Sequence, residues 1–372
     1  MINVKYTSSG KSPSGYGSAA RADIAALFIS GVNVTCETIQ QTAETADFGI
    51  EGQIMTHLEE RDIPYKIKIV HLTPDLIPTY KEDGVYTISR LAWETDRLPK
   101  EWIEPLNELD EIWTMSNQMA DMIHASGVTT PCFAFPEPIY TLRAKEQIPS
   151  FQLKFPKDFI FYSIGQWIDR KNFRGLLRSY WKTFSGEERV SLLIKTYRIN
   201  YSESEYDLIK KEIRNWKNEL KLNHFPKILL VRQLLTDAQV QKLHQLGDCY
   251  ISSSAGEGWN RPMQEAMLYG KPVISGDHGG ITDIMTDLQY YKVPSKSYNA
   301  TEASHIPWYT REQKWKLLDE ERLGERMKYV FDNYAEAMKV GEKAQEFVVD
   351  SFSLQEVGRQ MRGRLNEISK TI

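Results

Sequence analysis

Two glutamates and a short predicted helix are the groups in this sequence best placed to bind and transform a ligand. Glu257 and Glu265 are separated by seven residues. A strand, Cys249–Ser252, is expected to run into a glycine-containing loop, and Pro262 is expected at the first position of the helix that follows, where its missing N–H is tolerated. The free N–H groups and positive dipole end of such a helix can receive a phosphate. The spacing therefore indicates one phosphate-bearing ligand approached by both carboxylates.

The elements that must position these residues alternate between strand and helix on both sides of a proline-rich segment, residues 136–158. Strand-like runs such as Ile2–Tyr6 and Phe159–Ile164 each open one such series, and the tail from about Arg311 is predicted to be helical. This alternation favours parallel sheets with helices on both faces, and ligands bind at the carboxyl ends of such strands. We predict two doubly wound α/β domains facing a central cleft. Residues 1–150 form one domain, and residues 151–350 form the other.

Composition excludes several classes of protein. The 372 residues are 41% hydrophobic and 26% charged, with a formal net charge of −4, so disorder, collagen and a disulfide mini-protein are excluded. The sequence has no apolar run of membrane-spanning length and no signal-peptide core at its start. Its three cysteines form no CxxC pair. We therefore expect a cytoplasmic protein, and a phage-encoded one in its host's cytoplasm is an alternative.

Charge is unevenly spread between the two halves. Residues 1–150 hold 12 Lys and Arg against 21 Asp and Glu, a net charge of −9, whereas the remainder holds 34 against 29, a net charge of +5. An acidic first half is a poor surface for DNA phosphates or anionic lipid. The mild basic excess of the second half suits a small phosphate-bearing ligand, although solvated faces could account for both values.

The segment from Glu257 through Ile274 carries a recognisable pattern, E-G-x-x-x-P-x-x-E-A-M-x-x-G-x-P-V-I. It resembles the E-x7-E signature of retaining GT-B glycosyltransferases, in particular family 4. The early glycine loop Gly15-Tyr16-Gly17, the segment Gly165–Asn172 and the Leu246–Cys249 run fit the same family, so the resemblance covers nearly the whole chain. It implies the GT-B fold, two Rossmann-like domains around a cleft that binds a nucleotide-sugar. Residues 1–150, joined by a C-terminal helix in 351–372, would then form the acceptor-side domain, and residues 151–350 the donor domain.

The resemblance also implies roles for individual residues. Glu265 would hydrogen-bond the ribose hydroxyls, Glu257 would lie near the transferred sugar, and Lys171 would hold the leaving diphosphate. Backbone N–H groups around Trp259, Asn260 and Arg261 would meet the diphosphate or the sugar. Taken alone, Glu265 could be a favourable first-turn acid and Glu257 a solvated loop acid.

Three positions depart from the family pattern. A small residue is usual where Asn260 stands and a hydrophobic one where Arg261 stands, and the more serious departure is Gln166. Gln166 stands where an arginine commonly helps the lysine to hold the diphosphate, and Arg170, Lys195 or Arg261 could supply the missing charge. Lys195 could equally be a surface lysine. In the first domain, the loop Gly15-Tyr16-Gly17 would let the backbone approach the donor phosphates closely, with a plain turn as the alternative.

Sugar transfer needs stabilisation of the negative charge that grows on the departing nucleoside diphosphate. The sequence has no Asp-x-Asp pair at a strand end and no zinc-binding spacing among its seven histidines, so Lys, Arg and helix amides must meet that charge and no metal is expected. The resemblance implies retention, with the leaving phosphate taking the acceptor proton. Glu94 is our candidate for contact with the acceptor or sugar. His71 is a second candidate, with a satisfied strand-end histidine as the alternative.

These observations predict a retaining, metal-independent hexosyl- or pentosyltransferase that uses a nucleotide-sugar, expected to be UDP-linked, and a glycan or small-molecule acceptor. The alternatives are transfer to hydroxymethylated bases of phage DNA, a non-catalytic nucleotide-sugar-binding protein, and an epimerase or phosphorylase of the same fold. Gly10-Lys11-Ser12 lacks the first glycine of a P-loop, and Gly15-x-Gly17 lacks the third glycine of a dinucleotide fingerprint, so these two interpretations are rejected.

Overall fold

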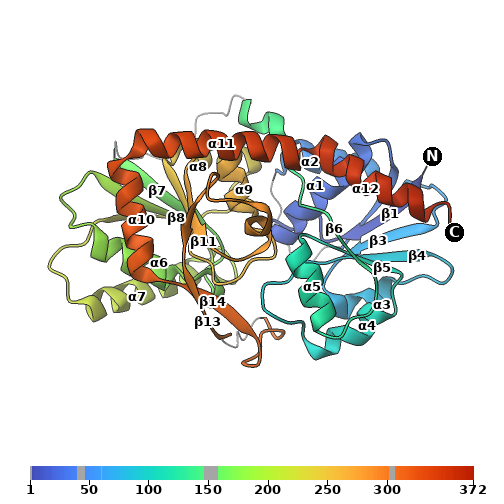
Figure 1. Ribbon diagram of the computed structural model, residues 1–372, viewed down its shortest axis with the longest axis horizontal. Helices are drawn as coiled ribbons and strands as arrows, with labels where there is room; N and C mark the ends of the chain where they lie inside the picture. The colour runs from blue at the N-terminus through green and yellow to red at the C-terminus, as the bar shows by residue number, and fades with distance from the viewer. Residues whose placement is uncertain (1, 40–46, 60, 146–157, 301–305) are drawn as a thin grey trace. The chain divides into compact units, whose positions relative to one another are not determined.

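The computed structural model describes residues 2–39, 47–59, 61–145, 158–300 and 306–372. The chain divides into two compact units (Figure 1). Unit 1 comprises Met1–Glu146 and Val348–Ile372, and unit 2 comprises Gln147–Phe347. The domain boundary predicted between residues 150 and 151 lies outside the described residues.

Unit 1 is built on a six-stranded parallel sheet. Its spatial strand order is β2-β1-β3-β4-β5-β6, so the chain starts next to one edge, adds the edge strand β2 and then crosses to the other edge. The central strands β3 and β4 are buried along nearly their whole length, which suits a sheet covered on both faces. The strands are β1 (Asn3–Ser8), β2 (Asn33–Thr38), β3 (Ile67–His71), β4 (Tyr86–Arg90), β5 (Glu111–Thr114) and β6 (Cys132–Ala134).

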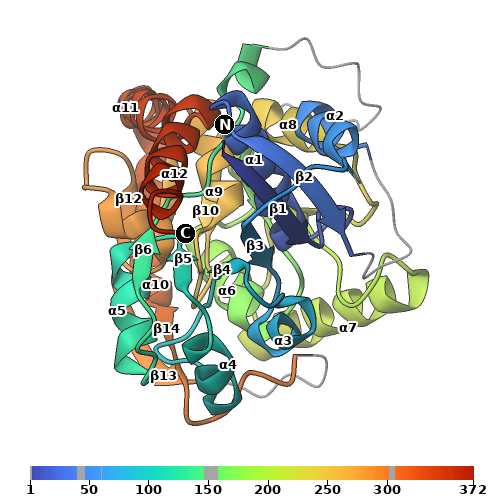
Figure 2. The same cartoon turned by 90° about the vertical axis from the view of Figure 1, so that its right-hand side faces the viewer.

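The helices of unit 1 include one from each end of the described chain. The helix α12 (Leu354–Ile368) packs against α1 (Gly15–Ile29), and Figure 2 shows both chain ends on this unit. The contact is close because Gly358 lacks a side chain: a Cβ there would lie 2.2 Å from the Ala26 carbonyl oxygen. The other helices are α2 (Gly49–Leu58), α3 (Ile77–Tyr80), α4 (Ile103–Asn107), α5 (Asn117–Ala125) and the 3-10 turns η1 (Pro74–Leu76), η2 (Lys100–Trp102) and η3 (Thr141–Lys145).

Unit 2 repeats the architecture with a second six-stranded parallel sheet, in the order β12-β11-β10-β7-β8-β9. Unit 2 also has a separate two-stranded sheet, the antiparallel hairpin β13–β14. The strands are β7 (Phe159–Ile164), β8 (Val190–Lys195), β9 (Lys227–Val231), β10 (Cys249–Ser252), β11 (Val273–Gly276), β12 (Tyr291–Val293), β13 (Ser295–Asn299) and β14 (Lys314–Leu318).

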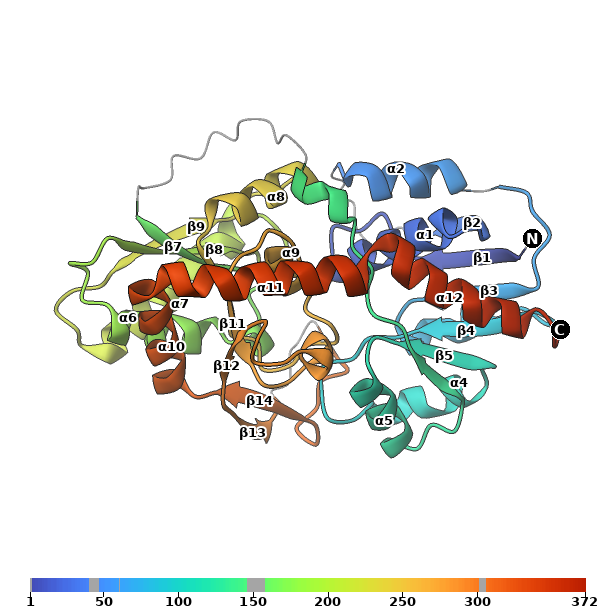
Figure 3. The same cartoon turned by 45° about the horizontal axis from the view of Figure 1, so that its top comes forward.

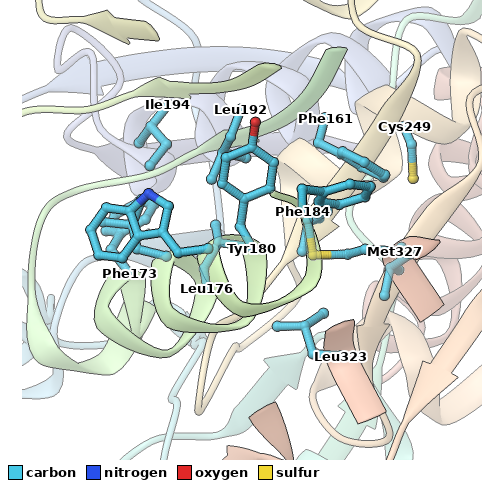
Figure 4. Packing of buried hydrophobic residues seen from close by; sticks show 14 of the residues in the cluster. Phe161, Phe173, Leu176, Tyr180, Phe184, Leu192, Ile194, Cys249, Leu323 and Met327 are labelled. Atoms are coloured by element: carbon cyan, nitrogen blue, oxygen red, sulfur yellow. The ribbon is translucent and has the colours of Figure 1, made fainter. Parts of the chain in front are cut away.

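The core of unit 2 lies between its sheet and the amphipathic helix α6 (Phe173–Thr183). Apolar residues recur on α6 with helical spacing, and Tyr180 and Phe184 point toward Phe161 and Leu192 of the sheet (Figure 4). The other helices are α7 (Glu203–Leu220), α8 (Asp237–Leu246), α9 (Arg261–Leu268), α10 (Glu320–Asp332), α11 (Tyr334–Phe352) and the 3-10 turns η4 (Asp169–Lys171) and η5 (Gly280–Ile284).

The tail of the chain differs from the sequence prediction. The stretch after Arg311 was predicted to be helical, but it first forms β14, the second strand of the hairpin, and helices begin only at Glu320. The alternation of buried and exposed residues along β14 explains the strand. From Glu320 onward the prediction is correct, and the last two helices, α11 and α12, follow each other with one residue between them (Figure 3).

Across the described ranges, no helix combines the length and the apolar character needed to cross a membrane.

Candidate functional site

A pocket lies at the carboxyl edge of the unit 2 sheet, where β7 and β10 end. This edge is where parallel α/β sheets bind ligands, because the strand-to-helix loops converge there. Several lining groups are hydroxyls, and the two charged ones are Lys171 and Glu257. The lining residues are Ser163, Ile164, Lys171, Phe173, Tyr250, Ser252, Ser253, Ser254 and Glu257.

Glu257 is held by two cations from the turn that follows β7. Lys171 Nζ lies 2.5 Å from Glu257 Oε1, and Arg170 Nη1 lies 3.3 Å from Glu257 Oε2. Burial disfavours the charged carboxylate, but the attraction of Lys171 and Arg170 outweighs it and keeps the pKa of Glu257 below its ordinary value of 4.5. Three residues that the sequence predicted for one site therefore share one charged cluster.

Backbone contacts fix this cluster from both sides. Arg170 Nη1 donates to the Gly256 carbonyl at 2.6 Å, and the Ala255 N–H donates to the Arg170 carbonyl at 2.7 Å. The Ser253 hydroxyl donates to the Lys171 carbonyl at 2.8 Å. The turn η4 and the loop after β10 are thus joined by several short bonds, so the two cations and the carboxylate are positioned by rigid backbone.

Two glycines that pack against the backbone of Glu257, Gly279 and Gly280, were not predicted from the sequence. Gly279 has a φ of +98°, and the Gly280 N–H donates to the Glu257 carbonyl at 3.3 Å. A Cβ on Gly280 would lie 1.9 Å from the Gly258 carbonyl oxygen, so no side chain fits there. The Gly-Gly dipeptide shortly after the strand β11 was the available signal.

Glu265 lies on α9 and is contacted by a buried histidine. His244 Nε2 lies 3.3 Å from Glu265 Oε2, and His244 Nδ1 lies 3.1 Å from the Tyr162 hydroxyl. A carboxylate only accepts hydrogen bonds, so the proton belongs on Nε2. Arg261 Nε lies 3.8 Å from Glu265 Oε1. Nothing in the local sequence around His244 indicated this contact, because it joins α8 to α9 through the fold.

The start of α9 differs by one residue from the prediction. The helix begins at Arg261, so Pro262 occupies the second helical position rather than the first. Asn260 precedes it in the left-handed region, with a φ of +86°, a conformation that asparagine tolerates better than most residues. Its side chain donates to the Ser252 hydroxyl at 2.8 Å, which ties the helix start to the end of β10. Trp259, the preceding residue, is buried.

The other two unit 2 candidates lie at the ends of β7 and β8. Gln166 follows β7, and its side-chain amide donates to the Arg198 carbonyl at 2.7 Å. Lys195 ends β8, with its Nζ 5.1 Å from the centre of the Tyr197 ring and 4.9 Å from that of Tyr201. Lys195 is buried against aromatic faces, so it is not the surface lysine of the alternative interpretation.

The remaining candidates belong to unit 1. Gly15, Tyr16 and Gly17 form the first turn of α1, and a Cβ on Gly17 would lie 2.2 Å from the Ser12 carbonyl oxygen. Burial, and then the nearby Glu94 carboxylate, raises the pKa of the Tyr16 hydroxyl above its usual range. Tyr16 also packs its ring 5.2 Å from that of His71. The loop and Glu94 therefore gather at one place in unit 1, and their part in a cleft stays a prediction.

Among the residues that the structure describes, no cluster of three His, Cys, Asp or Glu side chains is arranged to hold a metal ion. Whether the chemistry needs a metal stays a prediction.

Residues 144–314, which include this cluster, match the family model described as "Glycosyl transferases group 1". The chain carries a glycosyltransferase domain. This domain contains all of the unit 2 candidates, from Gln166 to Glu265, and its match confirms the prediction that the protein is a glycosyltransferase enzyme. No curated protein matches the chain in sequence.

Solved structures share the fold over the whole chain. Anabaena HepE, crystallised with UDP-glucose, superposes with a TM-score of 0.68 at 12% identity, covering 100% of both chains. Sucrose-phosphate synthase from Thermosynechococcus elongatus gives a TM-score of 0.71 at 13% identity, again covering 100% of both. A glycosyltransferase from Rickettsia africae gives 0.68 at 13% identity, covering 100% of this chain and 99% of the other. The predicted GT-B fold is confirmed.

Proposed function

We propose that the protein is a retaining, metal-independent glycosyltransferase that moves a hexosyl or pentosyl group from a UDP-linked sugar to a hydroxyl of a glycan or small molecule. The observation that carries the proposal is the cluster of Lys171, Arg170 and Glu257 beside the pocket at the carboxyl edge of the sheet. HepE, which shares the fold, was crystallised with UDP-glucose, and that supports a UDP-linked donor here.

In this proposal Lys171 and Arg170 stabilise the charge that grows on the departing diphosphate. Each charge-assisted hydrogen bond contributes roughly 1.5–3 kcal/mol, and a donor that is already in position when the bond breaks costs no reorganisation. Arg170 is our choice to replace the arginine that the family commonly has where Gln166 stands, because the Gln166 amide is bonded to backbone while Arg170 faces the same carboxylate as Lys171.

Glu265 is proposed to accept hydrogen bonds from the donor's ribose hydroxyls. His244 Nε2 contacts one carboxylate oxygen and Arg261 lies near the other, so both hold the acceptor group in position, and a carboxylate accepts several hydrogen bonds at once. Glu265→Gln should lower the affinity for UDP more than the affinity for 2′,3′-dideoxy-UDP, measured by calorimetry. An equal loss of affinity for both ligands would contradict the proposal that Glu265 binds the ribose hydroxyls.

The decisive experiment measures free nucleoside diphosphate released from a panel of UDP-, GDP- and ADP-sugars, with and without acceptors. We expect release from a UDP-sugar that persists in EDTA, and NMR of the product should show the donor's anomeric configuration. An inverted product would contradict retention, and loss of activity in EDTA would contradict metal independence. Thermal stabilisation by nucleotide-sugars without turnover against any acceptor would instead favour a non-catalytic binding protein. Activity restricted to hydroxymethylated DNA would favour the phage DNA alternative.

A further inference from the structure

Unit 1 contains a buried histidine with one ring nitrogen satisfied and the other not. His71 ends β3 and is 1% exposed. Its Nδ1 lies 2.9 Å from the Tyr6 hydroxyl, whereas its Nε2 has no hydrogen-bond partner among the described residues. The sequence leaves two alternatives for His71, a functional residue and a fully hydrogen-bonded structural one. In the structure only one of its two ring nitrogens is hydrogen-bonded.

A second buried polar atom without a partner in the described structure belongs to Ser8, the neighbour of His71 in the sheet. Ser8 ends β1 and is the register partner of His71 on the neighbouring parallel strand, and its Oγ is also buried and unbonded. Register partners in a parallel pair project from the same face of the sheet. Tyr6, two residues before Ser8, projects from that face and bonds Asp23 of α1. The two atoms therefore share the α1 side of the sheet, at its carboxyl edge.

The hydrogen bonds around His71 place the proton of its ring on Nδ1. The Tyr6 hydroxyl lies 2.9 Å from Asp23 Oδ2, and this carboxylate is paired with Arg90 at 2.8 Å. A carboxylate can only accept, so the single hydroxyl proton of Tyr6 is directed to Asp23, and the Tyr6 oxygen must accept from an N–H at His71 Nδ1. Burial, and then Arg90, keeps the pKa of His71 well below 6.5, so the ring is neutral. Its Nε2 therefore carries a lone pair and no proton.

A buried lone pair without a partner is unfavourable, and only a hydrogen-bond donor can satisfy it. Phosphate, carboxylate and carbonyl oxygens cannot do so, whereas a hydroxyl can. We propose that His71 Nε2 accepts a hydrogen bond from a hydroxyl of the sugar acceptor, with Ser8 Oγ as the second polar contact of that hydroxyl. This inference rests on the proposed function and assigns the acceptor a defined place in unit 1, near the Tyr16 ring and Glu94.

The first test measures the tautomer of the His71 ring by NMR. In protein with ¹⁵N-labelled histidine and UDP bound, two-bond ¹H–¹⁵N spectra should show His71 as the Nδ1–H tautomer. The probes are glycerol, methyl α-D-glucopyranoside and methyl α-D-galactopyranoside, and at least one of them should shift the Nε2 resonance. The Nε2–H tautomer would overturn the inference, and so would an Nε2 resonance that none of the three probes moves, since water alone then satisfies the nitrogen.

The second test compares two substitutions, each of which replaces the hydrogen-bonding group of one ring nitrogen and loses that of the other. His71→Asn keeps an N–H near the Nδ1 position and removes the acceptor at Nε2, whereas His71→Gln keeps an acceptor near Nε2. The measurement is the ratio of sugar transfer to these probes over donor hydrolysis to free sugar, with the donor that turns over best in the panel above. We expect the ratio to fall at least tenfold in His71→Asn and less in His71→Gln.

Controls separate this inference from the proposed function. Ser89 also has a buried hydroxyl without a partner in the described structure, but it is the register partner of Val70 and so projects from the opposite face; Ser89→Ala should leave the ratio unchanged. Thermal unfolding shows whether each variant folds. A wild-type protein that neither hydrolyses nor transfers any sugar would refute the proposed function. An active wild type with the same ratio in His71→Asn would refute this inference alone.

Discussion

At the scale of single residues, the site combines one carboxylate with two cations at short range. Glu257 holds Lys171 and Arg170 in place, and their positive charges exceed its single negative charge. A departing diphosphate would therefore meet a net positive, partly buried cluster, in which electrostatic interactions are stronger than in water. Two predictions belong to this scale.

Lys171→Ala should reduce kcat by about 10²–10³, because one positioned charge donor to the leaving group is lost. The free energy of unfolding should change much less than the activation free energy, since Arg170 still pairs with Glu257. Steady-state release of nucleoside diphosphate and denaturant unfolding check the two parts. Arg174→Ala is the matched control: this cation lies three residues further on, is 55% exposed and pairs with Glu219. Near-normal turnover in Lys171→Ala would contradict the assignment.

Glu257→Gln should change how stability depends on pH. The folded-state pKa of Glu257 is lowered from 4.5, so its ionised form stabilises the fold fully above pH 4.5, and this stabilisation is lost as pH falls through the lowered pKa. Glutamine does not titrate. The wild type should therefore exceed the variant in unfolding free energy near neutral pH, and the difference should shrink as the solution is acidified below pH 4.5. Urea unfolding across this range measures the difference, and a gap that widened in acid would contradict the ion-pair geometry.

At the scale of elements, close backbone approaches at glycines decide how helices and loops pack. The packing of α12 on α1 depends on Gly358, and the loop that carries Glu257 depends on Gly280. Gly363, also on α12, has open space around it, so two positions on one helix can be compared directly.

Gly358→Ala and Gly363→Ala should have opposite effects although both lie on α12. At Gly358 the added methyl would overlap the Ala26 carbonyl, so a loss of about 1–3 kcal/mol is expected. At Gly363 a Cβ meets nothing within 4 Å, so alanine should stabilise the protein by about 1 kcal/mol through helix propensity. Chemical denaturation of both variants gives the comparison. Equal effects would mean that α12 does not pack on α1 through Gly358.

At the scale of the whole molecule, each unit has a core of its own. In unit 1 the core includes Tyr6, Ile69 and Trp113 with α12 residues such as Met361, and in unit 2 it includes Phe161, Tyr180 and Leu192. Every unit 2 candidate for donor binding lies within the residues 144–314 that match the glycosyltransferase model. Donor binding should therefore stabilise unit 2 through groups that unit 2 itself supplies.

Saturating UDP should slow amide hydrogen exchange in unit 2, most strongly in Ser253–Leu268, because binding to the folded state stabilises it by mass action. Mass spectrometry of peptides after exchange measures this. The Lys171→Ala variant at the same UDP concentration is the control and should show weaker protection of that segment. Protection confined to unit 1 would contradict the placement of the donor residues.

Much of the fold could be predicted because hydrophobic periodicity and turn residues are local signals. The strands Phe159–Ile164 and Cys249–Ser252 have the predicted bounds, and the helix Leu354–Ile368 lies within the predicted segment 351–372. The hairpin β13–β14 was missed because its pairing is made between strands rather than within one run of residues. The first position of α9 was wrong by one residue, since the left-handed Asn260 rather than Pro262 sets where the helix begins.

The sequence by itself determined the chemical types and the order of the site residues: the two glutamates seven residues apart, the lysine after the strand, and the glycines that mark the turns. These are local in the chain, so pattern alone reveals them. Only the tertiary structure decided that Arg170 shares Glu257 with Lys171, that His244 bonds Glu265, and that Tyr6 and Asp23 leave His71 with an unprotonated nitrogen. Each of these contacts joins residues at least 17 positions apart, and their protonation follows from partners that only folding brings within hydrogen-bond distance.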